Sequence, residues 1–390
     1  MTLLASVFLT IGLLGLLGAT FLPGVLAAGL ARFRPHPRPA ASGLSAGPVS
    51  LQILVTAHNE ETTVADTLQS LVQAVAGSAL VAPSIIVGLD HCTDRTEAVV
   101  QTFAQASPVP VSCQPKQGSP GKWRMLVELV RAARTDWIAL VDCGSRWDPL
   151  LVEHAVPHLQ TQEVQAVSPS YMPQKAGLLE RMHWRLEHAI RALEMLSGGP
   201  ISVHGATVFY RRSTLLVALD RLEDRDWLND DLVIPAMIRL MDGFNRVVYL
   251  RFSDPSRAYV VDRGLKPAAS VEYRRRRRIM HGYTQWLQLL IAQHCFRQPV
   301  IALHASRRVC RMLWSYWVSF LALAVILICL DLPGVTVWHV APFILAAGLV
   351  MAANNFLRRM GMAYLSASMT PFHLFRRLVA GPDRGTIAWQ

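Results

Sequence analysis

Between residues 51 and 261, short apolar runs alternate with longer stretches in which apolar residues recur every three or four positions. The short runs are typical of buried strands, and the longer stretches are typical of helices that cover a sheet. This pattern predicts an α/β fold with a mainly parallel sheet and helices on both faces. We expect strands at 51–56, 84–89, 109–113 and 137–141, and helices at 62–76, 96–106, 122–134 and 149–159.

Both ends of the chain carry much longer apolar stretches. Met1–Leu30 contains no charged residue, and Met312–Leu330 and Val337–Phe356 are separated by a short turn. About 20 apolar residues suffice to cross a bilayer, so we predict three transmembrane helices. Arg311 and Arg358 flank the last two, which favours a cytoplasmic location for the middle of the chain. A cleaved signal peptide and buried helices of a soluble protein are the less favoured alternatives.

The segments 283–296 and 362–378 mix aromatic and polar residues, and fit either interfacial helices or ordinary packed helices. The patterning divides the chain into an N-terminal transmembrane helix at 1–30, a basic and proline-rich linker at 31–50, a cytosolic α/β domain at 51–262, a basic and interfacial helical region at 263–311, two transmembrane helices at 312–357, and a cytosolic interfacial segment at 358–390.

Composition agrees with a location at a membrane. Of the 390 residues, 52% are hydrophobic, the mean hydropathy is +0.29 and the formal net charge is +11. The arginines cluster beside apolar stretches, which is typical of a cytoplasmic membrane face and argues against a nucleic-acid partner. The six cysteines show neither a CxxC pair nor zinc-ligand spacing, so we interpret them as reduced thiols.

Polar residues gather where the predicted strands end. His58–Glu61 follow the first strand, Asp90–Asp94 follow the second, and Asp142 follows the fourth. Ligands of such sheets bind beyond the carboxyl ends of the strands, so this pattern predicts a site. Each group alone has a structural alternative, since Asn59 and Thr93 are good helix caps and acids favour a first helical turn.

Four stretches in order resemble the family 2 glycosyltransferases, which are inverting, nucleotide-sugar-dependent enzymes of the Rossmann-like GT-A fold. They are ILVTAHNEETTVADTLQSL, IIVGLDHCTDRTEAVV, GKWRMLVELVRAARTDWIALVDCGSRWDP and WLNDDLVIPAMIRLMDGFNRVVYL. The resemblance covers about residues 51–286, and membrane helices flank the domain in many members. It implies a donor that is a nucleotide-diphosphate sugar, such as a UDP- or GDP-sugar.

For the donor, the resemblance implies that the loop after the first strand and Asp90 hold the base, with Lys122 near the nucleotide. An ordinary surface lysine is the structural alternative for Lys122. Asp142 matches the first Asp of the family's D-x-D motif, which implies Mg²⁺ or Mn²⁺ bound there. The second Asp is replaced by Gly144, so Ser145, Asp148 or water would have to compensate. The implied donor-binding residues are Thr56, Ala57, His58, Asn59, Glu60, Asp90, Lys122, Asp142, Cys143 and Gly144.

For the reaction, the resemblance implies that Asp231, with Asp230 second, is the base that takes a proton from the acceptor hydroxyl. An acidic helix N-terminus is the structural alternative. His204 and Gly205 match a stretch on the acceptor side. Arg275 and Arg278 fit a diphosphate-binding helix, although Ile279 follows where the strict motif has tryptophan; binding of lipid headgroups alone is the alternative.

We therefore expect a multi-pass enzyme of the cell membrane that transfers a sugar to a lipid or saccharide acceptor, with inversion, for glycolipid or envelope polysaccharide synthesis. Three spans are few for a translocating channel, which favours single additions over processive synthesis. The segment 183–191 is a candidate for acceptor choice. The alternative is a degenerate member that binds nucleotide or serves as a scaffold, because Gly144 removes a metal ligand.

Overall fold

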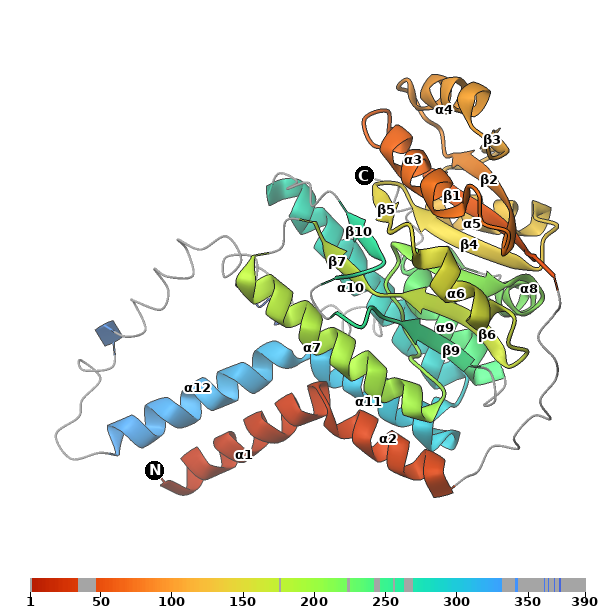
Figure 1. Cartoon of the computed structure of the whole chain (residues 1–390). Coiled ribbons are helices and arrows are strands. Elements are labelled where there is room, and N and C mark those ends of the chain that lie inside the picture. Colours follow the sequence, from red (N-terminus) through yellow and green to blue (C-terminus); the bar gives the residue numbers. More distant parts are fainter. Residues whose placement is uncertain are drawn as a thin grey trace. The chain divides into compact units, whose positions relative to one another are not determined.

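The computed structural model describes residues 2–33, 47–174, 177–222, 225–241, 246–254, 257–262, 269–331, 341–342, 361, 364, 368 and 372 (Figure 1). The chain divides into two compact units. One consists of Met1–Leu30 with Ala302–Gly385, and the other consists of Ala31–Ile301 with Thr386–Gln390.

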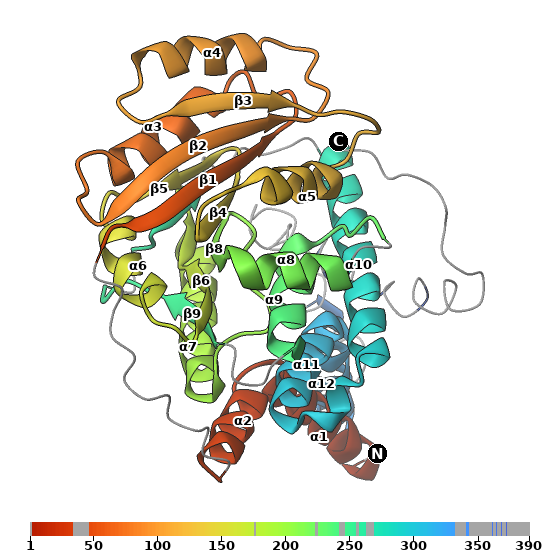
Figure 2. The same cartoon turned by 90° about the vertical axis from the view of Figure 1, so that its right-hand side faces the viewer.

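The larger unit is built on a seven-stranded sheet with the order β3-β2-β1-β4-β8-β6-β9 (Figure 2). All neighbouring pairs are parallel except those that β8 makes with β4 and β6. The predicted α/β fold with a mainly parallel sheet is thus confirmed. The strands are β1 (Val49–Ala57), β2 (Val81–Leu89), β3 (Val111–Pro115), β4 (Trp137–Asp142), β6 (Val164–Pro169), β8 (Thr207–Arg211) and β9 (Arg246–Leu250).

Helices cover both faces of this sheet (Figure 2). Because the central strands are buried from both sides, their side chains are apolar without alternation, as in Ile53, Leu54 and Val55 of β1. The helices of this unit are α3 (Val64–Val75), α4 (Thr96–Ala106), α5 (Lys122–Ala132), α6 (Leu151–Leu159), α7 (Leu178–Glu194), η1 (Met195–Ser197), α8 (Arg212–Arg221), α9 (Asp230–Met241), α10 (Ala269–Ala292) and η2 (Cys295–Arg297).

A small second sheet was not expected from the sequence. It joins β5 (Ser145–Trp147), β10 (Val260–Asp262) and β7 (Tyr171–Pro173) in the order β5-β10-β7. Each of these strands is 3 residues long. Such short strands carry no readable period, and their partners lie far away in the chain.

The segment 283–296, for which an interfacial and a packed helix were both open, is a packed helix over most of its length. It belongs to α10, whose Trp286 and Leu290 side chains are fully buried and whose Leu289 is nearly so. The predicted segment 362–378 lies outside the described residues, apart from 364, 368 and 372.

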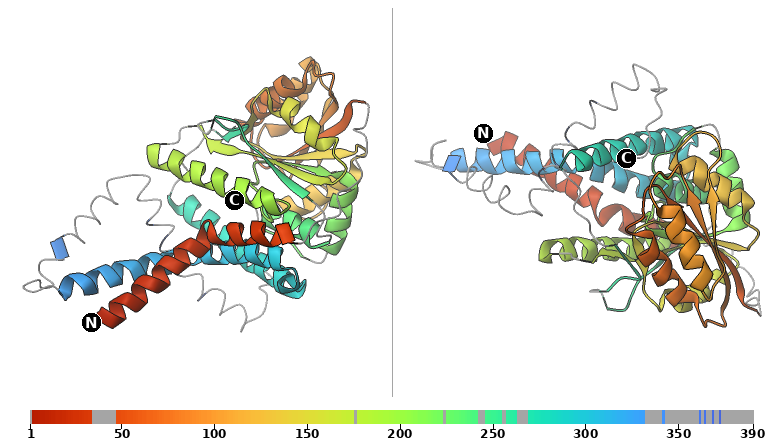
Figure 3. Two further views of the ribbon diagram at one scale, coloured as in Figure 1. Left: turned by 60° about the horizontal axis from the view of Figure 1, so that its bottom comes forward. Right: turned by 90° about the horizontal axis from the view of Figure 1, so that it is seen from above.

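The smaller unit contains α1 (Thr2–Ala19), most of α2 (Leu22–Phe33), most of α11 (Pro299–Met312) and α12 (Trp314–Leu330). Helices α1 and α12 lie side by side (Figure 3). Glycines allow this close approach, because a Cβ at Gly12 would lie 2.7 Å from the Leu321 side chain and one at Gly15 would clash with the Trp317 ring. Phe8 and Phe320 stack with ring centroids 5.6 Å apart.

The prediction of one continuous helix over residues 1–30 is wrong. Helices α1 and α2 are bent by 57° at Thr20–Phe21. Pro23 has no N–H to donate to the Ala19 carbonyl four residues earlier, which interrupts the helical hydrogen bonds here. The Thr20 N–H donates to the Leu17 carbonyl at 3.2 Å, and the Thr20 hydroxyl donates to the Leu16 carbonyl at 2.8 Å. Proline is tolerated in the first turn of α2, so a new helix begins there.

None of the described helices is by itself long and apolar enough to cross a bilayer. Two bent pairs meet the length and composition criteria together: Leu3–Ala19 with Leu22–Phe33, and Pro299–Met312 with Trp314–Leu330, the second pair bent by 61°. The predicted span 337–356 lies outside the described residues except for 341–342.

Candidate active site

The loops that follow β1 and β2 are joined by hydrogen bonds. The His58 Nδ1–H donates to the Asp90 carbonyl oxygen at 2.6 Å, and the Thr93 N–H donates to Asn59 Oδ1 at 2.7 Å. The Glu60 N–H donates to Thr96 Oγ1 at 2.8 Å. The structure therefore brings the predicted donor-binding loop and Asp90 together at the carboxyl edge of the sheet.

Asn59 and Thr93 do not cap helices, which was the structural alternative for them. The N-cap positions of α3 and α4 are Thr63 and Arg95. Asn59 has φ +56° and His91 has φ +52°. These are left-handed backbone conformations, which residues other than glycine adopt at a cost in free energy. Strain of this kind at two neighbouring strand ends is more common at functional sites than elsewhere.

Asp90 is fully buried and organises the next loop. Its Oδ2 accepts the Gly121 N–H at 2.9 Å, and its Oδ1 lies 3.0 Å from His91 Nδ1. Gly121 has φ +147°, a conformation that favours glycine, and it directly precedes Lys122. In this structure Asp90 therefore positions the turn before Lys122, and its predicted contact with the base stays a prediction.

The center of the site is an ion cluster around Lys122, the first residue of α5. The Lys122 Nζ lies 2.6 Å from Asp142 Oδ1 and 3.1 Å from Asp230 Oδ1. Burial alone lowers the pKa of Lys122, but the two carboxylates more than offset this and hold it above its usual value. Burial raises the pKa of Asp142, against the lowering effect of Lys122.

Asp231 and Gly205 lie against this cluster. A Cβ built on Gly205 would be 3.5 Å from the Asp231 Cβ and 3.7 Å from Asp142 Oδ2, which is ordinary van der Waals distance. The contact arises because β8 pairs with β4, and the Asp142 N–H donates to the Ala206 carbonyl at 3.1 Å. Both predicted carboxylates, Asp142 and Asp231, thus lie at one edge of one sheet, and the Gly121–Lys122 turn connects them to Asp90.

His204 lies in an aromatic group that the sequence did not reveal in full. Its ring stacks on Tyr171 with centroids 3.6 Å apart and planes at 11°, and Trp184 packs edge-on against both. Tyr171 belongs to the small sheet and its hydroxyl donates to Asp262. Trp184 falls in the segment 183–191, which was the candidate for acceptor choice, whereas Tyr171 had no sequence signal.

Arg278, on α10, is a predicted diphosphate ligand whose charge acts on the cluster. Its guanidinium is one of the charges that lower the pKa of Asp142. Its Nε is buried and makes no hydrogen bond to any part of the chain that the structure describes. The side chain of Arg275 lies outside the described residues.

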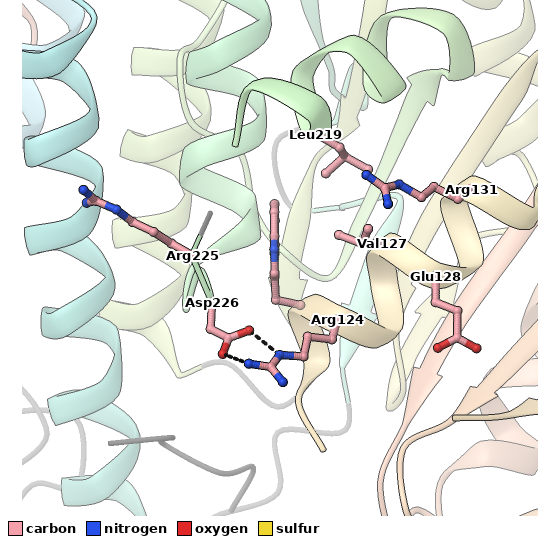
Figure 4. Close-up of a pocket in the computed structure, with 8 residues that line it drawn as sticks. Arg124, Val127, Glu128, Arg131, Leu219, Arg225 and Asp226 are labelled. Atoms are coloured by element: carbon pink, nitrogen blue, oxygen red, sulfur yellow. Dashed lines mark hydrogen bonds and ion pairs between the residues drawn. The ribbon is translucent and has the colours of Figure 1, made fainter. Parts of the chain in front are cut away.

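The loop before the acidic pair is held by residues that sequence reasoning missed. Arg124 of α5 makes a two-pronged contact with Asp226, with N–O distances of 2.7 and 2.6 Å (Figure 4). Gln285 of α10 donates to the Asp226 carbonyl at 2.9 Å and accepts the Leu228 N–H at 3.0 Å. Asn229 donates to the Ile279 carbonyl at 3.0 Å.

Beside this loop is a hollow of about 740 Å³ along α5 (Figure 4). None of the predicted site residues lines it, so we place the chemistry at the Lys122 cluster, where the titratable groups converge. The residues that line the hollow are Trp123, Arg124, Val127, Glu128, Arg131, Leu219, Arg225 and Asp226.

Among the described residues, Asp142 has no second carboxylate beside it at the position that the D-x-D pattern requires. The residue at the second position of the D-x-D pattern is Gly144, which leads into β5 and has no side chain to offer a metal ion. Its φ of +92° is a conformation that favours glycine. In the part of the chain that the structure describes, no group of three His, Cys, Asp or Glu side chains is arranged to hold a metal ion. Burial raises the pKa of Cys143 to about 12, so its thiol stays protonated.

The sequence profile described as glycosyltransferase-like family 2 matches residues 48–277, more than half of the chain. A mannosyltransferase from Pyrobaculum calidifontis in complex with GDP-Man and Mn²⁺ matches with TM-score 0.65 and 17% identity, over 96% of this chain and 100% of the other. A glucosyl-3-phosphoglycerate synthase from Mycobacterium tuberculosis with Mn²⁺, UDP-Glc and phosphoglyceric acid matches with TM-score 0.40 and 19% identity, over 63% and 79%. No curated protein matches the chain.

The profile spans the predicted donor loops, the Lys122 cluster and the acidic pair, and it ends at Arg277, one residue before Arg278. The likeness to the Pyrobaculum enzyme shows a common fold of the GT-A type. With the fold, the carboxylates at the sheet edge and the profile in agreement, the chain belongs to glycosyltransferase-like family 2 and is a glycosyltransferase.

Proposed function

We propose that this chain is a membrane-bound, inverting glycosyltransferase that moves a sugar from a nucleoside-diphosphate donor to a lipid or saccharide acceptor at the membrane surface. The observation that carries the proposal is the meeting of Lys122, Asp142, Asp230 and Asp231 at the carboxyl edge of the sheet. Cations for a departing diphosphate and a carboxylate for an acceptor proton are the two groups that such a transfer needs.

The division of labour between the two neighbouring acids follows from their contacts. Asp230 is bound by the Lys122 ammonium, whereas Asp231 lies against Gly205, next to the aromatic group of His204. Asp231 is therefore our base. It takes the proton of the acceptor hydroxyl as the new bond to C1 forms, and the bond from C1 to the diphosphate oxygen breaks on the opposite face. The nucleoside diphosphate leaves with the electron pair, next to Lys122 and Arg278.

Membrane attachment is supported by the apolar surface of the smaller unit. Large side chains are exposed around α1 and α12 even though the two helices pack together, and an exposed apolar surface of this kind fits lipid better than water. The exposed residues include Leu3, Leu4, Val7, Leu13, Leu14 and Leu17 of α1 and Val318, Leu323, Val325 and Ile328 of α12.

A lipid acceptor is supported by α7 in the larger unit. Leu178, Met182 and Leu186 are exposed at spacings of four and so form one stripe, with exposed Arg181 and Arg185 beside it. An apolar stripe flanked by arginines suits the interface of an anionic bilayer. Because the same helix also carries Trp184 of the aromatic group, a lipid-linked acceptor at the bilayer surface would have a short path to Asp231.

The experiment is a donor screen with the full chain in lipid nanodiscs, measuring the nucleoside diphosphate released from UDP- and GDP-sugars with a lipid extract as acceptor. We expect one donor to be consumed, and the Asp231→Asn variant to lose about 10²–10⁴-fold in rate. Asp220→Asn on α8, an exposed acid paired with Arg131 at 3.4 Å, is the matched control and should keep its rate. Full transfer by Asp231→Asn would contradict the mechanism, and no release from any donor would favour a degenerate scaffold.

A further inference from the structure

The groups that surround Asp142 determine whether a divalent cation can bind there. A hard divalent cation such as Mg²⁺ or Mn²⁺ needs several oxygen ligands, and carboxylates usually supply those that come from the protein. Here the position that would supply a second carboxylate is Gly144, whose φ of +92° disfavours any other residue.

Of the two side chains that could have compensated, Asp148 is paired elsewhere and Ser145 is buried. Asp148 Oδ2 is paired with Arg257 at 2.9 Å, and its Oδ1 accepts the Leu150 N–H at 3.0 Å. Ser145 is buried in β5. Both Asp148 carboxylate oxygens are therefore already engaged by partners other than Asp142.

The place between the carboxylates is already filled by a cation. The Lys122 ammonium has three N–H groups, of which one reaches Asp142 at 2.6 Å and another reaches Asp230 at 3.1 Å. The third is left for an oxygen of a bound diphosphate. Arg278, whose buried Nε makes no hydrogen bond to any described residue, adds a second positive charge near enough to lower the pKa of Asp142.

We infer that the Lys122 ammonium, fixed by Asp142 and Asp230 and assisted by Arg278, takes the place of a divalent cation, so that this chain binds its nucleoside diphosphate without Mg²⁺ or Mn²⁺. The inference rests on the proposed function, because it concerns the same donor site. A metal ion would have to displace a paired ammonium from Asp142 and would gain no second carboxylate from Gly144.

The test is a calorimetric titration of the full chain in nanodiscs with UDP and with GDP, in EDTA and then in MnCl₂. We expect one of the two nucleotides to bind with dissociation constants that agree within about twofold in EDTA and in MnCl₂. A metal contribution of about 1.4 kcal/mol to binding would instead change the dissociation constant about tenfold. Binding that needs Mn²⁺ would overturn the inference and leave the proposed function intact. Absence of binding in both conditions would overturn the two together.

A charge-removing variant makes the test specific to Lys122. In EDTA, Lys122→Gln should weaken nucleotide binding by about tenfold or more, because it removes a charge-assisted hydrogen bond. Arg131→Gln removes the same charge from the other end of α5 and should bind as the wild type does. Unchanged binding by Lys122→Gln in EDTA would also overturn the inference. If that variant fails to fold, as judged by its circular dichroism, the comparison of EDTA and MnCl₂ on the wild type still decides.

Discussion

Gly282 of α10 lies directly against Asn229, the residue that precedes the acidic pair. A Cβ at Gly282 would be 2.6 Å from Asn229 Oδ1 and closer still to Cγ, and the Asn229 side chain is buried. Helix α10 therefore fixes the starting point of α9, and with it the two carboxylates at its first turn.

Gly282→Ala should reduce the transfer rate and lower the free energy of unfolding by no more than about 2 kcal/mol. The added methyl displaces Asn229 and Asp231, and a 1 Å misplacement of a reacting group can cost about a hundredfold. Overpacking costs about 1–3 kcal/mol, and removal of a glycine from a helix returns about 1 kcal/mol. Gly29→Ala, in α2, is the matched control, because no atom lies within 4 Å of a Cβ there. An unchanged rate in Gly282→Ala would contradict this role of α10.

Gly144→Asp should create a metal dependence, because by the inference drawn for Lys122 the wild type binds its nucleotide without a divalent ion. The new carboxylate lies two residues after Asp142, so Mn²⁺ should bind together with UDP or GDP. Electron paramagnetic resonance detects the bound Mn²⁺ directly. Gly144→Asn has the same size and the same left-handed strain, of about 1–3 kcal/mol, but no charge. Both variants should unfold at similarly reduced denaturant concentrations. Equal Mn²⁺ signals from the two would contradict the prediction.

His188 of α7 should make the chain less stable in mild acid. Burial lowers its pKa, with Arg191 and Arg251 adding to the effect, although the Tyr171 carbonyl 3.1 Å from Nε2 and the Glu187 carboxylate oppose it. The unfolded chain, with a histidine pKa of about 6.5, therefore binds more protons than the folded chain. Stability contributed by neutral His188 is present at higher pH and is lost as the pH falls through about 6.5, by at most about 1.4 kcal/mol per pH unit.

The measurement is the free energy of unfolding in urea between pH 7.5 and pH 5.5, a window chosen around the value of about 6.5 for an unfolded histidine. His188→Gln, which can still donate to the Tyr171 carbonyl, should flatten the pH dependence. His294→Gln, at an exposed position, should leave the slope of the wild type unchanged. The same slope in all three proteins would show that His188 does not titrate in this range.

Helix α7 should be protected by anionic lipid. Hydrogen–deuterium exchange of α7 in nanodiscs should slow when anionic lipid replaces neutral lipid, because Arg181 and Arg185 each gain about 1 kcal/mol near such a surface. Exchange around Val217, an exposed apolar residue of α8, is the internal reference and should not change. The double variant Arg181→Gln/Arg185→Gln should abolish the difference. Equal protection in neutral lipid would mean that α7 has no electrostatic contact with the bilayer.

The donor half of the fold could be predicted closely because its signals are local. Predicted strands at 51–56, 84–89 and 137–141 fall inside β1, β2 and β4, and the helix at 96–106 coincides with α4. The strand at 109–113 lies two residues too early compared with β3. Within this half, alternation of apolar runs and amphipathic stretches was sufficient, and the strand ends indicated the site.

The acceptor half depends on contacts that no local pattern carries. Tyr171 meets His204, and Arg124 meets Asp226, only because the folded sheet brings distant segments together. The sequence also could not show that Lys122 lies between Asp142 and Asp230, since its alternative as a surface lysine was equally compatible with a lone Gly-Lys pair. Pro23 is a signal for a helix break, but the long uncharged stretch around it favoured a single helix.

The reversed direction of β8 has a consequence for how this enzyme could diversify. The predicted donor-binding residues lie at the ends of strands β1, β2 and β4, whereas His204 and Gly205 lie just before the first residue of β8. The two sets of residues are thereby encoded in separate stretches of the gene, and the Asp142–Ala206 backbone bond is one of the contacts that join them. Exchange of the stretch upstream of β8 could give the enzyme a new recipient molecule while it keeps its original sugar.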